Sequence, residues 1–425
     1  MLETIFALSS GTPPAAIGVI RISGPQAGEV LAALAGRLPA PRRAVLANLV
    51  DAAGNLLDSA LVLWLPGPAT ATGEDMAELH CHGGRAVIAA VEGALAAFPQ
   101  LRRAAPGEFT RRAFAHGRID LAEAEGLADL LAAETEVQRR SALALAGGAL
   151  SRRVEAWREA LLAASAALEA VLDFADEDDV ATLPADFARR LEALAGEIGQ
   201  HLSAPRAETL REGFRVVIAG PPNAGKSTLF NALVESEAAI TAPLAGTTRD
   251  VLTRPVALAG LPFLFADTAG LRDETGDAIE AIGIERARGE LDRADLVLWL
   301  GPEGEGPEGA WEIEAQADRA GHQLKCAPRH RLSALSGDGM DELRADLVTL
   351  ASRAMPAPGE MALNQRQHRL LAEAQALVSE AAGHSDPLLA AEALRQARVA
   401  FDSLLGRTTT EDMLDALFGR FCIGK

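Results

Sequence analysis

Gly220-Pro221-Pro222-Asn223-Ala224-Gly225-Lys226-Ser227 is a GxxxxGKS phosphate-binding loop, and it stands between the β-branched run FRVVIA and the helix-like run STLFNALV. Its glycines permit a tight turn, while successive backbone N–H groups and the helix N-terminus cradle phosphate. Lys226 supplies a compact positive charge, and the hydroxyl of Ser227 suits Mg²⁺. Strand, loop and helix in this order predict a doubly wound α/β domain that binds a nucleotide through Asn223, Ala224, Gly225, Lys226, Ser227 and Thr228.

Two shorter motifs follow in the order that a nucleotide hydrolase requires. Asp267-Thr268-Ala269-Gly270 ends the apolar run LPFLFAD, which places a carboxylate at the carboxyl edge of a parallel sheet. Gly246-Thr247-Thr248-Arg249-Asp250 lies between the two loops, and a threonine in such a switch segment completes the coordination of Mg²⁺. We assign that role to Thr248, and we expect Asp267 to reach the ion through water. The predicted nucleotide contacts in these motifs are Thr247, Thr248, Asp267, Thr268, Ala269 and Gly270.

The rest of the chain changes in character along its length. Its 425 residues are enough for roughly two to four domains. Apolar runs alternate with turn clusters up to residue 118, whereas Ala and Leu recur at helical spacing through 119–210 and again through 353–425. We therefore predict an amino-terminal α/β domain (1–118), an all-α helical domain in two parts (119–210 and 353–425), and an α/β domain inserted between them (211–352).

Charge and composition exclude several classes of protein. A net charge of −19 argues against non-specific coating of nucleic acid, so any RNA contact must use local basic patches. The three cysteines, Cys81, Cys326 and Cys422, form no CxxC pair and indicate neither a disulfide framework nor a zinc ribbon. No apolar run is long enough to cross a bilayer, and the first residues do not read as a secretory leader. We expect a cytoplasmic protein that does not contact membranes.

The motif that reads guanine is harder to find. Ser333-Ala334-Leu335 fits the SA loop that contacts the base, but the N/TKxD motif expected upstream is represented only by Leu324-Lys325-Cys326-Ala327. On this alignment Ala327 replaces the aspartate that accepts two hydrogen bonds from guanine, and its loss costs several kcal/mol of discrimination against adenine. The interval between Trp299 and Leu332 is short, which leaves room for a shifted substitute motif.

Signature segments extend over nearly the whole chain. They are GPPNAGKST, AGTTRD, DTAGLR and IGIERA in the nucleotide region, and IGVIRISG, TGEDMAELHCHGG, APGEFTRRAF and the terminal FCIGK outside it. In these segments the chain resembles the MnmE (TrmE) family of tRNA-modifying enzymes. The resemblance implies an amino-terminal domain that binds 5-formyl-tetrahydrofolate, and a GTPase domain that pairs with its twin in a homodimer. It also implies work with an MnmG-type FAD protein to modify C5 of the wobble uridine, position 34, of certain tRNAs.

The resemblance assigns individual residues to the folate site. Arg21 and Glu78 fall where the family contacts folate, and Lys425 at the carboxyl terminus falls at another contact. Arg118 stands where the family commonly has lysine, which keeps the charge but not the geometry of the group. Cys422 matches the family's terminal cysteine, and a reactive thiol and a buried, inert thiol both stay open for it.

Leu271 follows the DxxG motif where Ras-like enzymes have a glutamine that orients water, and its side chain can neither donate nor accept a hydrogen bond. The resemblance implies that Asn223 instead coordinates a K⁺ that takes the place of an arginine finger. It also implies that Glu280 is the carboxylate that positions water. Three nearby carboxylates compete for that role, because this stretch is longer than the family's usual spacing: Glu274, Asp277 and Glu285. Further K⁺ ligands are implied at Ala242, Leu244 and Thr247.

Two other classes of function stay open. A ribosome-assembly or RNA-chaperone GTPase would use the same nucleotide switch, although the folate-type amino-terminal domain and the FCIGK end argue against it. A scaffold with a degenerate nucleotide domain is the other alternative. Its only support is the missing aspartate of the guanine motif.

Overall fold

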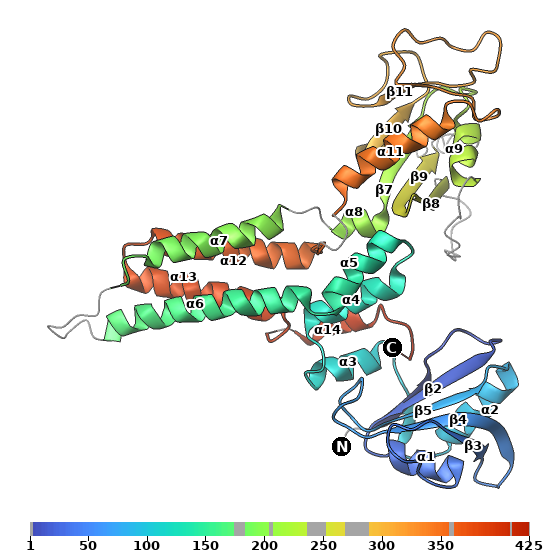
Figure 1. Ribbon diagram of the computed structural model, residues 1–425, viewed down its shortest axis with the longest axis vertical. Coiled ribbons are helices and arrows are strands. Elements are labelled where there is room, and N and C mark those ends of the chain that lie inside the picture. Colours follow the sequence, from blue (N-terminus) through green and yellow to red (C-terminus); the bar gives the residue numbers. More distant parts are fainter. Residues whose placement is uncertain are drawn as a thin grey trace, which may run out of the picture. The chain divides into compact units, whose positions relative to one another are not determined.

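The computed structural model describes residues 3–173, 183–203, 207–235, 252–267, 289–356, 361–408 and 410–424 (Figure 1). The chain divides into two compact units, which are described separately. The first comprises Met1–Ala128 with Asp402–Lys425, and the second comprises Asp129–Phe401.

A six-stranded sheet forms most of the first unit, with strand order β3-β4-β5-β2-β1-β6. Its neighbours are antiparallel, apart from the parallel pair β1 and β6. Side chains alternate between the two faces of a strand, so Ile20 and Ile22 point into the core while Arg21 points away from it. The strands are β1 Thr4–Leu8, β2 Ile17–Ser23, β3 Val45–Val50, β4 Leu56–Leu65, β5 Met76–His82 and β6 Leu101–Arg103. The core face packs against α1 (Ala27–Ala35) and α2 (Arg85–Ala96).

The carboxyl-terminal segment of the chain belongs to this first unit. Helix α14 (Glu411–Phe418) packs against α3 (Glu108–Ala115) and the start of α4 (Leu121–Ala132), where Leu121, Ala124 and Phe418 form a small core. Gly107 allows this approach, because a Cβ there would lie 2.2 Å from the carbonyl oxygen of Phe418. At the end of the tail, a Cβ on Gly424 would lie 2.3 Å from the carbonyl oxygen of Leu8. Gly424 therefore lies directly against the end of β1 in the amino-terminal sheet.

Long helices make up one part of the second unit. Helices from both sides of the nucleotide region in sequence pack together, and Figure 1 shows them side by side. The ring of Trp157 stacks on that of Phe401 at 6.2 Å between centroids, which joins α6 to α13. Capping boxes begin α5 at Thr135 and α12 at Asn364, where each side chain satisfies an unpaired backbone N–H. The helices are α5 Glu136–Ala146, α6 Ala149–Asp173, α7 Phe187–Leu202, α12 Gln365–Gly383 and α13 Pro387–Leu404.

A second six-stranded sheet forms the other part of this unit, with order β12-β11-β10-β7-β9-β8. Every pair is parallel except β8 and β9, as expected for a doubly wound domain with one antiparallel edge. Phe214, Val216 and Ile218 of β7 pack into a core with α9 and α11. The strands are β7 Phe214–Ala219, β8 Leu252–Leu258, β9 Leu261–Asp267, β10 Leu296–Trp299, β11 Trp311–Glu314 and β12 His330–Arg331. The helices are α8 Ala207–Glu212, α9 Lys226–Glu235 and α11 Met340–Ala354.

Two crossovers of this sheet contain no helix. Residues 300–310 join β10 to β11 and residues 315–329 join β11 to β12, and both stretches, which are described throughout, consist of turns and extended chain. Parallel strands are usually joined through a helix. The doubly wound domain predicted over 211–352 should alternate strands with helices, and this alternation fails in this half of the sheet. The interval between Trp299 and Leu332 is short because these two crossovers contain no helix.

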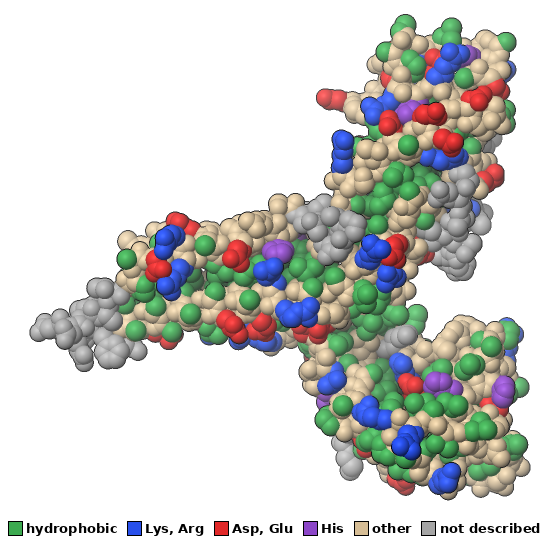
Figure 2. All heavy atoms as spheres, viewed as in Figure 1, with side chains coloured by type: hydrophobic (Ala, Val, Ile, Leu, Met, Phe, Trp, Pro, Cys, Tyr) green, Lys and Arg blue, Asp and Glu red, His purple; other side chains and the backbone are tan. Residues whose placement is uncertain are grey.

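Surface charge in the part of the chain that the structure describes is mixed. On the face drawn in Figure 2, Lys and Arg side chains alternate with Asp and Glu over the helical bundle, and they form no extended basic stripe there. This agrees with the strongly acidic composition. None of the helices in the described ranges is both long enough and apolar enough to pass through a membrane.

Candidate functional site

The phosphate loop leaves the carboxyl end of β7 and leads into α9. Gly220 has φ of 151°, and a Cβ there would lie 3.1 Å from the backbone nitrogen of Gly301, so the loop passes close to the end of β10. Lys226 is buried, and its Nζ donates to the carbonyl oxygen of Pro221 at 2.9 Å. The lysine side chain therefore folds back along the loop, with its charge beside the backbone that would surround a phosphate.

Ser227 and Asp267 come together although they belong to different motifs. The Ser227 Oγ donates to Asp267 Oδ2 at 2.7 Å, because Asp267 ends β9 and β9 pairs in parallel with β7. Asp267 is 1% exposed. A hydroxyl and a carboxylate are the hard oxygen ligands that Mg²⁺ prefers beside a nucleotide, so these residues fit that ion.

A cavity of about 150 Å³ lies beside the phosphate loop. Residues from the phosphate loop, the first turns of α9, the segment after β11 and the SA loop meet in it. It is lined by Gly225, Thr228, Leu229, Ala315, Gln316, Asp318, Arg319, Leu332, Ala334 and Leu335. Two predicted contact regions, at 225–228 and 333–335, are thus brought to one place, together with a segment after β11 that the sequence did not single out.

Asp318 is the carboxylate of this cavity. A hydrogen bond with Ser333 is the largest of the interactions that lower its pKa below the ordinary value, so the group is ionised at neutral pH. An ionised carboxylate accepts hydrogen bonds at two oxygens and can therefore receive the paired N–H groups of guanine. Ser333 itself is 1% exposed.

The structure does not bring Leu324–Ala327, the segment aligned with the N/TKxD motif, to the cavity beside the phosphate loop. Ala327 does not line that cavity, and its backbone N–H donates to Glu303 at 2.9 Å in an exposed turn. Lys325 is paired in the fold: its side chain is 1% exposed, and its Nζ bonds to the carbonyl oxygen of Trp299 at 2.8 Å and to the carboxylate of Glu312. Its ammonium group thus anchors the helix-free crossover to the sheet.

Asp318 was not selected from the sequence, because its segment matches only the aspartate of the N/TKxD motif. The segment after β11 reads Ala315-Gln316-Ala317-Asp318, without the asparagine or the lysine. The signal that remains is positional: Asp318 follows a parallel strand by four residues, on the edge where nucleotide sites form. The short interval noted from the sequence thus contains an aspartate that lines the cavity beside the phosphate loop.

Several predicted site residues cannot be placed. The predicted Mg²⁺, K⁺ and nucleotide contacts of the switch and DxxG segments, the candidate Glu280 and the terminal lysine lie outside the described residues. These are Ala242, Leu244, Thr247, Thr248, Thr268, Ala269, Gly270, Glu280 and Lys425.

The structure brings together Arg21 and Glu78 in the first unit. The two residues are direct partners across β2 and β5, and Arg21 Nε donates to Glu78 Oε1 at 2.8 Å. His80 lies 3.2 Å from the other carboxylate oxygen. Burial works against ionisation of Glu78, but the hydrogen bonds with His80 and Arg21 outweigh it, so its pKa lies below the ordinary value. The face of the sheet away from α1 and α2 thus carries a charged cluster.

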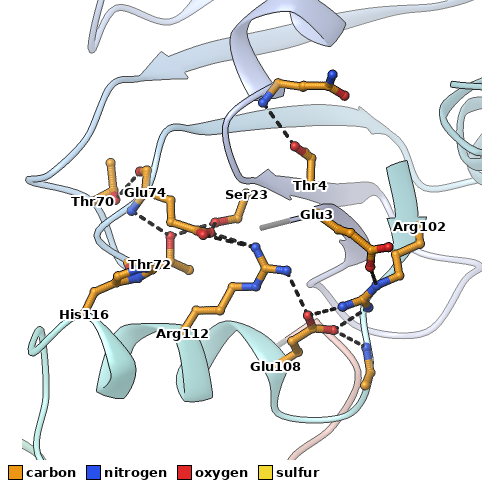
Figure 3. A network of polar contacts seen from close by, with 12 residues as sticks. Glu3, Thr4, Ser23, Thr70, Thr72, Glu74, Arg102, Glu108, Arg112 and His116 are labelled. Carbon is orange, nitrogen blue, oxygen red and sulfur yellow. Dashed lines mark hydrogen bonds and ion pairs between the residues drawn. The ribbon is translucent and has the colours of Figure 1, made fainter. Parts of the chain in front are cut away.

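A buried polar network adjoins this cluster (Figure 3). Ser23, two residues along β2 from Arg21, donates to Glu74 at 2.7 Å. Glu74 also pairs with Arg112 of α3 at 3.0 Å, and Arg112 pairs with Glu108 at 2.9 Å. All three charged side chains are at most 12% exposed, so the loop before β5 is held firmly against α3.

Arg118 lies against this same loop. A Cβ on Gly73 would be 3.3 Å from Arg118 Cγ and 2.8 Å from His116 Cβ, so the close contact requires glycine there. The Nδ1 of the His116 ring donates a hydrogen bond to the carbonyl oxygen of Thr72 at 2.8 Å, because a carbonyl oxygen can only accept. The predicted folate residues Arg21, Glu78 and Arg118 therefore border one polar region of the first unit.

Cys422 and Cys81 have different surroundings. Cys422 is exposed, and its carbonyl oxygen accepts from the backbone N–H of Gly107 at 3.5 Å. Cys422 is therefore not a buried thiol. Cys81 is buried on the core face of β5, and burial raises the pKa of its thiol to about 12.

A parallel sheet with a phosphate loop, a buried Ser–Asp pair and a carboxylate beside the SA loop define a P-loop hydrolase of the GTPase class. A family model described as the MnmE helical domain matches residues 121–422, and one described as the GTP-binding protein TrmE N-terminus matches residues 4–118. The chain belongs to the MnmE family of tRNA modification GTPases.

Relatives support this over the full length. The tRNA modification GTPase MnmE of Novosphingobium aromaticivorans is 65% identical, and that of Erythrobacter litoralis is 63% identical; both alignments cover 100% of each chain. Among solved structures, the G domain of the T. maritima FeoB iron transporter is 24% identical and covers 32% of this chain and 98% of its own. Its TM-score is 0.24, so we draw no conclusion from it.

Proposed function

We propose that this tRNA modification GTPase holds guanine in the cavity beside the phosphate loop and reads it with Asp318. The observation that carries the proposal is the position of this carboxylate in one cavity with Gly225 and Thr228. Adenine lacks the paired N–H groups that guanine presents, so a carboxylate favours guanine. If Asp318 has this role, the missing aspartate at Ala327 no longer supports the alternative of a degenerate nucleotide domain.

The phosphate end of the site would hold Mg²⁺ through Ser227, Thr248 and, by way of water, Asp267. When bound, this ion neutralises charge that develops on the phosphates. Asn223 would contribute an amide oxygen to a K⁺ site, together with Ala242, Leu244 and Thr247, and oxygen donors of this kind suit that cation. Glu280 would position the attacking water. In this scheme the GTPase domains of a homodimer pair when GTP is bound.

The reaction that GTP hydrolysis serves would be modification of C5 of the wobble uridine, position 34, of certain tRNAs. An MnmG-type FAD protein would be the partner, and a 5-formyl-tetrahydrofolate site would use Arg21, Glu78, Arg118 and Lys425. Support comes from the Arg21–Glu78 pair and from the neighbouring polar network. The exposed thiol of Cys422 lies on the tail that runs against the same sheet. We place this work in the cytoplasm, and we retain the division at 118, 210 and 352 as a proposal.

Nucleotide binding tests the proposal. The unsubstituted protein should bind GDP more tightly than ADP, and Asp318→Asn should remove most of that preference, a change of about 1.5 to 3 kcal/mol for a hydrogen bond to a charged group. Asp341→Asn is the matched control, because Asp341 is 94% exposed at the start of α11. Calorimetry with both nucleotides gives the ratio. Equal affinities for GDP and ADP in the unsubstituted protein would reject the proposed guanine site.

A further inference from the structure

Gln316 links two parts of the nucleotide site directly. Its side-chain Nε2 donates to the backbone carbonyl oxygen of Asn223 at 3.0 Å, although 93 residues separate the two in sequence. Asn223 is in the phosphate loop after β7, whereas Gln316 follows β11, next to the proposed base-reading Asp318. The hydrogen bond therefore ties the segment that faces the base to the loop that faces the phosphates.

Both ends of this bond have an unusual backbone conformation. The φ angle is 58° at Gln316 and 63° at Asn223, in the left-handed region that side chains other than glycine rarely adopt. Such a conformation persists where surrounding contacts hold it, and it is frequent at functional sites. A contact that holds the Asn223 carbonyl oxygen in place therefore helps to maintain the conformation of the whole turn.

A second contact reinforces the first. The Gln316 side chain packs over Gly225, where an added Cβ would lie 3.1 Å from Nε2 and 3.3 Å from Cγ. The backbone around Gln316 is itself fixed: its carbonyl oxygen accepts from Arg319 at 2.9 Å, and the next residue, Ala317, donates to Leu332 at 3.1 Å. Gln316 thus reaches the phosphate loop at two points from an anchored position.

The Gln316 side chain also lies between two cavities. Gln316 lines the 150 Å³ cavity proposed for the base and a second cavity of about 300 Å³, which is bordered by Pro221, Pro222 and Asn223. The second cavity leaves this side of the phosphate loop without close packing. Support for the loop on that side must come from the residues in the wall, and Gln316 is the one whose side chain bonds to Asn223.

We propose that Gln316 is a positioning residue that holds the phosphate loop at Asn223 in the conformation that receives the nucleotide. Within the proposed function, it acts on affinity and not on the choice of base, because every nucleoside diphosphate uses the same loop. An amide N–H is sufficient for this task, and so is the ammonium of a lysine, whereas a carboxylate or a methyl group cannot donate.

Four variants test this with GDP and ADP as probes. Gln316→Leu and the near-isosteric Gln316→Glu should each weaken the binding of both nucleotides by about 3- to 10-fold, the change that one neutral hydrogen bond produces. The ratio of the two affinities should stay the same. Gln316→Lys restores a donor and should bind both within about threefold of the unsubstituted protein. Gln323→Leu is the matched control, because Gln323 lines only the second of the two cavities, and it should bind normally.

The outcomes separate this proposal from the guanine site. Unchanged affinity in both Gln316→Leu and Gln316→Glu would overturn it, as would a loss confined to GDP, which would make Gln316 a base contact. Failure of Gln316→Lys to restore binding would also count against it. The guanine site is judged by Asp318→Asn, which should change the ratio of affinities. Thermal unfolding of each variant shows whether a loss of binding reflects the site or the fold, and Gln316→Glu keeps the test available if Gln316→Leu is unstable.

Discussion

The hydroxyl of Ser227 donates to the carboxylate of Asp267 at 2.7 Å, where the start of α9 meets the end of β9. Asp267 is almost completely buried, and a buried carboxylate requires protein donors or a cation in place of water. The parallel pairing of β7 with β9 brings these two oxygen ligands together from motifs that are far apart in sequence. The pair is the most specific feature of the phosphate end of the site.

Removal of the hydroxyl should weaken the response to Mg²⁺. We expect Ser227→Ala to raise the Mg²⁺ concentration for half-maximal GTP hydrolysis by about 10-fold or more, the scale on which groups at a metal site act. A titration with MgCl₂ at saturating GTP measures this. Ser352→Ala, on the exposed side of α11, is the control and should titrate like the unsubstituted protein. Coincident titrations for Ser227→Ala and the control would contradict the assignment.

The charged pair on the amino-terminal sheet should contribute to folate binding. Arg21→Ala and Glu78→Ala should each weaken 5-formyl-tetrahydrofolate binding by about 1 to 3 kcal/mol, because each removes a charged hydrogen-bonding group and leaves its partner unpaired. Calorimetry on folded protein gives the affinities. His82→Ala is a suitable control, since His82 is on the same strand but its side chain is 73% exposed and pairs with Asp58. Normal affinity in both variants would remove the site from this face.

Hydrolysis should depend on K⁺. No glutamine follows the DxxG motif, and Asn223 supplies an oxygen in the phosphate loop, so a monovalent cation is the expected source of positive charge near the β–γ bridge. We expect fast hydrolysis in K⁺ and slow hydrolysis in Na⁺, and Asn223→Ala should remove most of the difference. Equal rates in the two salts for the unsubstituted protein would exclude this mechanism.

The proposed water-positioning carboxylate has its own test. Glu280→Ala should leave GTP binding nearly intact while it lowers turnover by about 10²-fold or more, the range for a general base. Glu274→Ala, Asp277→Ala and Glu285→Ala are the matched controls, because the same stretch offers these carboxylates as competitors. Single-turnover assays with each variant decide among the four. If Glu280→Ala is fully active, the role belongs to whichever control loses turnover.

Acid should destabilise the first unit through Glu108. Burial opposes ionisation of this carboxyl, but the hydrogen bonds with Arg102, Ala105 and Arg112 prevail and lower its pKa to about 2. A group whose pKa is lowered on folding contributes stability above its unfolded pKa, near 4.5, and that contribution is lost as the pH falls toward 2. Denaturant unfolding between pH 6 and about 2.5 should therefore show a steep loss.

A glutamine variant isolates this contribution. Glu108→Gln should lower the free energy of unfolding at neutral pH and flatten its fall below pH 4.5. Glu136→Gln is the control: Glu136 pairs with Arg139 and Arg140 on an exposed helix, where water screens the interaction, so we expect a smaller change. If the pH profile of Glu108→Gln matches that of the unsubstituted protein, the network does not carry the acid sensitivity.

The amino-acid sequence by itself determined the phosphate loop, the strand that ends at Asp267, and the helices on either side of the nucleotide region. These features are local: a glycine-rich turn between a β-branched run and a helical run has one physical interpretation, and helical periodicity is visible within a few turns. The family signatures GPPNAGKST and FCIGK are equally local, since each is a continuous stretch of sequence.

Only the tertiary structure decided which aspartate lies beside the SA loop and what Lys325 does. In sequence, Lys325 looks like the lysine of a guanine motif, but the fold buries it against Glu312 and the carbonyl oxygen of Trp299. Asp318 carries no recognisable motif, yet the parallel order of β11, β10 and β7 brings the ends of these strands to one edge and sets Asp318 beside the phosphate loop. The physical reason is that strand pairing and crossover length fix where these side chains meet, and neither is written in the residues next to them.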